Sequence, residues 1–256
     1  MIRQLPRFKR TAPQCELLEQ AKNTRAFIRG LWEAASPNDR RQAAFLALLV
    51  QAGWNNYGKG SKGRVSTRQW RNERLAEFLD VEPDDTSVAK GLAATFPALR
   101  RTAVALLELD TGITRCYGPL RPLTLQFVEA NPSTVASAFR EVASQRKAET
   151  KLKKVMKLVS HTIQSSTGKK FNLLNGITPA LACLDPDQRF PIMNFKTKGL
   201  LKQLSEEADY EGAVELYRQI GRHNIKDSLE LDVYAATQFP RNRRKGRSKR
   251  RRRPKD

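Results

Sequence analysis

The chain has 256 residues, with 47 Lys or Arg against 26 Asp or Glu, so its formal net charge is +21. No apolar run approaches the roughly 20 residues that span a bilayer, and no apolar segment follows the basic N-terminus as in a secretory signal. We therefore expect an intracellular protein without a membrane partner, cytoplasmic or nucleoid-associated in a bacterium and nuclear in a eukaryote. Cys15, Cys116 and Cys183 lack CxxC spacing, which favours reduced thiols over disulfides or zinc ligands.

The first half of the chain has mostly helical periodicity. Helices are expected over 14–34, 36–52, 66–79, 87–94 and 97–112, with Ser36 and Pro37 as a capping pair and Ser66 as a second cap. A glycine-rich loop at 53–66 and an acidic turn at 80–86 separate them. Two prolines and a glycine in 113–127 argue against a helix there and favour an extended piece.

The second half is also expected to be helical. Asn131 and Pro132 begin one long helix or two, ending near residue 163, and a polar loop follows at 165–170. Shorter helices are expected near 171–174, 178–185, 195–205, 209–221 and 226–239, with a turn at Asn175 and Gly176 and caps at Asn194 and Asp209. The fold class is mostly α, a compact multi-helix body with a disordered basic tail. We divide the chain into an N-terminal helical region (1–130), a C-terminal helical region (131–239) and the tail (240–256).

The tail, residues 240–256, holds eleven Lys or Arg and one acid, so it carries +10 of the total charge. It has no apolar side chain to bury and is expected to be disordered alone. Its cations suit phosphates, whose neutralisation releases counterions. The alternatives are a nuclear localisation signal or a tail that binds nonspecifically. The candidate contacts are Arg241, Arg243, Arg244, Lys245, Arg247, Lys249, Arg250, Arg251, Arg252 and Arg253.

Residues 53–74 are a second candidate, because they interleave aromatic and basic side chains. Glycines allow close approach to phosphate and aromatic rings stack on unpaired bases. The alternative is a mobile loop whose tryptophans are core, which the helical spacing favours for Trp70. GKGSKG does not match GxxxxGK[ST], so nucleotide hydrolysis is not indicated. The candidates are Trp54, Tyr57, Lys59, Lys62, Arg64, Arg68, Arg71 and Arg74.

Residues 146–157 form a basic helical segment with an apolar stripe. We select Lys147, Lys151 and Lys154 as phosphate contacts, and a merely solvated face is the equal alternative.

Catalytic and metal motifs are not found. His161 and His223 are far apart in the sequence and lie in no HExxH, and no GxSxG appears, so we expect no metal and no cofactor. If the protein were a nuclease or base-modifying enzyme, the first candidates for its catalytic residues would be Asp185, Asp187, Glu206 and His161.

The segment FNLLNGITPALACLDPDQRFPIMNFKTKGLLKQL, residues 171–204, resembles the hairpin region of helix-hairpin-helix DNA glycosylases. Residues 174–178 match the start of such a hairpin, where the resemblance implies that backbone N–H groups around Asn175 and Gly176 hold a DNA phosphate. Thr178, Ala180 and Asn194 stand where the family has its second glycine, the lysine of its lyase members and its catalytic aspartate. The resemblance therefore implies DNA binding without glycosylase chemistry. The alternative is a helical pair joined by an Asn-Gly turn.

The sequence thus predicts a non-catalytic nucleic-acid-binding protein, with DNA favoured over RNA, that serves as a subunit of a DNA- or RNA-processing complex. An enzyme acting on nucleic acid is the alternative. A third reading is a protein-interaction subunit whose basic faces meet an acidic partner.

Overall fold

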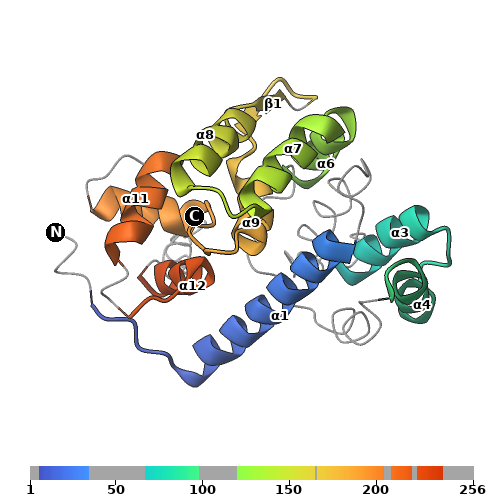
Figure 1. The fold of residues 1–256 in the computed structure, drawn as a ribbon, viewed down its shortest axis with the longest axis horizontal. Coiled ribbons are helices and arrows are strands. Elements are labelled where there is room, and N and C mark those ends of the chain that lie inside the picture. The colour runs from blue at the N-terminus through green and yellow to red at the C-terminus, as the bar shows by residue number, and fades with distance from the viewer. Residues whose placement is uncertain are drawn as a thin grey trace, which may run out of the picture.

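The computed structural model describes residues 6–34, 67–97, 120–164, 166–204, 209–220 and 224–238. The described chain is mostly helical, as the periodicity predicts, and its one sheet is a two-stranded antiparallel hairpin (Figure 1). The elements are α1 (Ala12–Ala34), α3 (Thr67–Leu79), α4 (Asp85–Thr95), α6 (Leu120–Ala130), α7 (Pro132–Ala143), α8 (Ala148–Val159), β1 (Thr162–Gln164), β2 (Lys170–Asn172), α9 (Leu174–Leu184), α10 (Phe195–Gln203), α11 (Tyr210–Ile220) and α12 (Ser228–Gln238).

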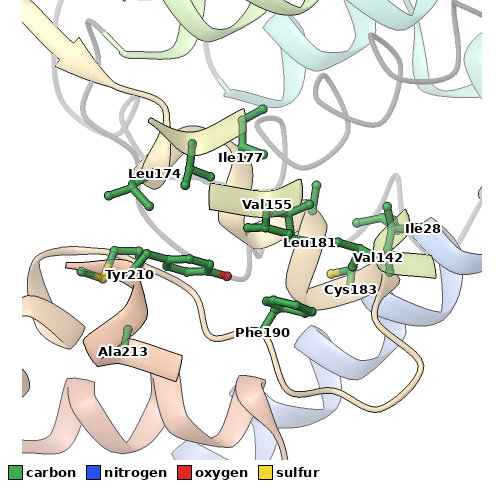
Figure 2. Packing of buried hydrophobic residues seen from close by; sticks show 14 of the residues in the cluster. Ile28, Val142, Val155, Leu174, Ile177, Leu181, Cys183, Phe190, Tyr210 and Ala213 are labelled. Atoms are coloured by element: carbon green, nitrogen blue, oxygen red, sulfur yellow. The ribbon is translucent and has the colours of Figure 1, made fainter. Parts of the chain in front are cut away.

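Helix α9 lies at the centre of the core, because every residue in it except Asn175 is buried. It packs against α1, α6 and α7. Figure 2 shows Val155 of α8 and Leu181 of α9 among the side chains that fill this core, together with Phe190 from the loop after α9. An apolar helix that is covered on all sides is typical of the middle of a helical domain.

Helix α1 is the long rod at the bottom of Figure 1, and it packs against α9 and α12. Its buried residues Leu18, Ala21 and Ile28 recur at helical spacing on one face. Three arginines add polar links to the C-terminal half of the chain. Arg10, just before α1, contacts Glu230, and Arg25 contacts Asp227. Arg29 donates to the carbonyl oxygens of Cys183 and Asp185 at the end of α9.

Several predicted boundaries are confirmed. The one-or-two helices after Pro132 are two, α7 and α8. The side chains of Asn194 and Asp209 accept backbone N–H groups at the starts of α10 and α11, as expected for caps. Asp84 caps α4 in the same way, within the turn that the acidic residues predicted.

Other predictions are wrong. Residues 120–127 are helical, because Pro122 lies in the first turn of α6, where a backbone N–H has no helical partner to lose. Residues 170–172 form β2 rather than a helix. Asn175 and Gly176 do not form a turn, because both lie within α9, which begins at Leu174.

The helix expected over 36–52, the loop at 53–66, the cap at Ser66, most of the helix expected over 97–112 and the tail at 240–256 lie outside the described residues.

Candidate nucleic-acid interface

Helix α8 has one buried face and one lysine-bearing face. Val155, Leu158 and Val159 are buried in the core. Lys153, Lys154 and Lys157 lie within an arc of about 100° on the opposite side, at the i, i+3 and i, i+4 spacings that place side chains next to one another. Lys153 and Lys157 are exposed and Lys154 is half-buried. We call these three residues the α8 lysine face.

The α8 lysine face is not neutralised. None of its three ammonium groups makes a hydrogen bond or ion pair with another side chain in the part of the chain that the structure describes. Like charges at these spacings repel by a few tenths of a kcal/mol, so the arrangement costs the free protein a little stability. An external polyanion would remove that cost.

Lys151 was predicted to contact phosphate from this helix, and the structure contradicts that prediction. Its side chain is 1% exposed, on the buried side of α8, and its ammonium lies 3.0 Å from the equally buried Asp185 carboxylate. Asp187 is 3.9 Å away from the same ammonium. Lys151 therefore ties α8 to the loop that follows α9. Lys147, the third candidate, is exposed at the N-terminal end of α8.

The C-terminal end of α8 is closed by His161. Its Nδ1 lies 2.9 Å and 3.0 Å from the carbonyl oxygens of Lys157 and Leu158, so Nδ1 must carry a hydrogen and donate. The ring also packs against Phe127 of α6. Nε2 has no described partner and is not among the fully buried unpartnered atoms.

The hairpin of β1 and β2 follows α8 directly and lies beyond its end in Figure 1. Ile163 and Phe171 face the core, while Lys169 and Lys170 are exposed at the turn. The ammonium of Lys169 stands 5.5 Å from the ring centre of Phe171. The sequence pattern predicts only a polar loop at 165–170, and neither lysine is among the predicted phosphate contacts.

The charge of this region is one-sided. From Thr150 to Leu184 the chain carries six lysines and no acidic residue. Five of the six, all except Lys151, lie at the surface of α8 or the hairpin. A surface of this kind has a positive potential that attracts phosphate-rich partners.

Asn175 and Gly176 do not form the phosphate-binding turn that was expected of them. The Gly176 N–H already donates to the Leu173 carbonyl, and the residue is buried in α9. A Cβ at Gly176 would collide with the side chain of Thr124 on α6. The glycine is therefore required for close packing of α6 on α9, which is a structural role. Asn175 is half-buried, and its Oδ1 is buried without a partner.

The other family-matched positions also have structural roles. The Thr178 hydroxyl donates to the Leu174 carbonyl and accepts from the Met193 N–H, and Ala180 is buried. Asn194 caps α10 and donates to the buried Asp232.

The remaining nucleic-acid candidates cannot be placed. Trp54, Tyr57, Lys59, Lys62, Arg64 and the basic residues of the tail lie outside the described residues. Trp70, Arg68, Arg71 and Arg74 belong to α3, but the positions of their side chains are not described.

Of the four candidates for catalysis, the structure brings together only Asp185 and Asp187, which both lie beside the Lys151 ammonium. Asp185 is engaged by Lys151 and by the Arg189 N–H, so it holds a turn together. His161 lies ten residues along the chain from Lys151, about 15 Å at the rise of a helix. Glu206 lies outside the described residues. Among the described His, Cys, Asp and Glu, no group of three is placed to bind a metal ion.

Comparison with known proteins adds no assignment: no family model, curated protein or solved structure matches the chain. Within the described residues, no helix has the length and apolar character needed to cross a membrane.

Proposed function

We propose that this protein binds nucleic acid through the α8 lysine face and the neighbouring hairpin lysines. The observation that carries the proposal is that the ammonium groups of Lys153, Lys154 and Lys157 make no ion pair with a described residue, in a stretch of sequence from Thr150 to Leu184 that has no acidic residue. Each phosphate that such a surface neutralises releases condensed counterions, which favours binding.

The role proposed is binding rather than catalysis. Asp185 is committed to Lys151 and to the turn before Phe190, and the imidazole of His161 is committed through Nδ1 to the end of α8. These contacts explain the residues without any reaction. A protein of this kind would serve as a subunit that holds DNA or RNA for a processing complex.

The basic tail would complement this surface as a second contact. Its eleven cations can neutralise further phosphates, which adds affinity without sequence preference because phosphate contacts do not depend on the bases. Deleting residues 240–256 should weaken binding and reduce its salt dependence, while the charge of the remaining chain still supports binding.

The direct test measures binding of the full chain to a fluorescent 25-base-pair duplex at about 100 mM salt. The variant Lys153→Gln/Lys154→Gln/Lys157→Gln should lose about tenfold in affinity or more. The control Lys90→Gln/Lys202→Gln/Lys226→Gln removes the same charge from exposed lysines outside α8 and the hairpin and should lose much less. Equal losses would show that only net charge matters and would contradict the proposed surface.

An acidic protein is the competing partner for the same lysines. Co-purification before and after nuclease treatment separates the two, because a nucleic-acid bridge is lost on digestion. Survival of the partner, together with no affinity for duplex or single strands, would exclude the proposed function.

A further inference from the structure

We infer that the outer face of the hairpin reads bases in the major groove of duplex DNA. This inference rests on the proposed function and goes beyond it, since it assigns the nucleic-acid class and the residues that discriminate between sequences. It concerns four side chains, Thr162, Gln164, Lys170 and Asn172, which we call the hairpin outer face.

The strand register places these four side chains together. Thr162 is opposite Asn172 and Gln164 is opposite Lys170, with Ile163 and Phe171 between them facing the core. All four are exposed. Because side chains alternate across a strand, the two pairs point to the same side of the ribbon. They form a patch about 7 Å long and 5 Å wide, the length of about two base-pair steps.

The chemistry of the patch matches base edges. Gln and Asn can pair bidentately with adenine, and Lys donates to the acceptors of guanine. Thr162, Lys170 and Asn172 make no side-chain hydrogen bond to any described residue, so these groups are available to a ligand. Gln164 donates to the Gly168 carbonyl at 3.3 Å, which fixes its amide and leaves the amide oxygen to accept.

The surroundings support a groove rather than a flat partner. The hairpin projects directly after α8, and its inner side is held by Ile163 in the core and by contacts between β1 and α6. A two-stranded ribbon fits the roughly 12 Å major groove of B-form DNA, whereas the major groove of duplex RNA is too deep and narrow for side chains to read.

The test is selection of bound duplexes from a random-sequence DNA pool by the full-length protein. The wild type should enrich a short motif, with each lost base contact costing roughly 5- to 150-fold in discrimination. Gln164→Ala/Asn172→Ala should bind the pool with unchanged salt dependence and should lose the adenine positions of the motif, while Lys170 keeps its contact to guanine. Asn172→Ala alone, which keeps the Gln164 contact to the turn, should relax part of the motif. Gln203→Ala, an exposed glutamine on α10, is the matched control and should enrich the wild-type motif.

The outcomes are distinguishable. If the wild type binds duplex DNA without enriching a motif, or if the double variant enriches the same motif, the hairpin inference is wrong and the proposed function stands. Preference for duplex RNA or single strands over duplex DNA also overturns the inference alone. Failure to bind any nucleic acid overturns the proposed function and the inference with it.

Discussion

The Lys151 ammonium and the Asp185 carboxylate form an ion pair at 3.0 Å in which both side chains are only 1% exposed. The two residues are 34 positions apart, and the pair joins α8 to the loop after α9. The same carboxylate accepts the Arg189 N–H, so one buried acid positions both the loop and the helix that carries the lysine face.

Removing only the lysine of this pair should be costly. Lys151→Met leaves the Asp185 charge buried and unpaired, and we expect a loss of about 3–5 kcal/mol in the free energy of unfolding, measured by urea denaturation. The exposed control Lys153→Met should change stability by no more than about 0.5 kcal/mol. Lys151→Met/Asp185→Asn should recover part of the loss because no buried charge remains. Equal stability of the two single variants would contradict the structural role given to Lys151.

Gly176 should not tolerate even one added methyl group. A Cβ at this position would lie 2.9 Å from Cγ2 of Thr124 and closer still to its hydroxyl, so Gly176→Ala forces α6 away from α9. We expect destabilisation of about 1–3 kcal/mol by thermal or urea unfolding. The double variant Gly176→Ala/Thr124→Ala removes the colliding atoms and should be more stable than Gly176→Ala alone. No rescue would show that the contact is not what limits the position.

The amphipathic pattern of α8 was readable from the sequence, but the direction of Lys151 was not. Val155 and Val159 are buried as the stripe predicts. Lys151 lies at the edge of that stripe. Its burial depends on the ion pair with Asp185, which is distant in the sequence and so could not be predicted from the pattern of α8. The hairpin was not predicted, because strands of three residues are too short to show an alternation of apolar and polar side chains. Pro122 led to the wrong prediction of an extended segment, because a proline in the first turn is compatible with a helix.

The stability contribution of Asp232 should depend on pH. Burial raises the pKa of this carboxyl, against the opposing effects of Lys196 and the hydrogen bond from Asn194. Between the ordinary value of 3.8 and the raised value, the folded state binds more protons than the unfolded state, so the free energy of unfolding falls as pH rises. Asp232→Asn removes this penalty, and its stability relative to wild type should increase as pH rises above about 3.8.

The pKa of Asp84 is shifted in the opposite direction from that of Asp232, so the pH dependence of its contribution to stability should have the opposite sign. Hydrogen bonds from Ser87 and Thr86 lower the pKa of this capping carboxylate, so its stabilising effect is lost as pH falls. Asp84→Asn should therefore lose stability relative to wild type as pH rises toward 4. Chemical denaturation of both variants from pH 3 to 7 checks the two signs, and a pH-independent difference for Asp232→Asn would refute the first.

The two described cysteines should differ sharply in reactivity. Cys15 is exposed, whereas Cys183 is buried and its pKa is raised to about 12 by that burial. Only thiolates react with iodoacetamide at an appreciable rate. At pH 8, peptide mapping should find Cys15 alkylated in the folded protein and Cys183 alkylated only after denaturant is added. Early alkylation of Cys183 would mean that α9 is not the closed centre of the core.

Nucleic-acid binding as proposed requires that the α8 lysine face contacts phosphates. The decisive measurement is the slope of log affinity against log salt concentration for a 25-base-pair duplex, in the full-length wild type and in Lys153→Gln/Lys154→Gln/Lys157→Gln. Three lost phosphate contacts should reduce the magnitude of the slope by about 2 to 3. An unchanged slope in the triple variant would show that these lysines do not touch the duplex and would contradict the proposed nucleic-acid interface.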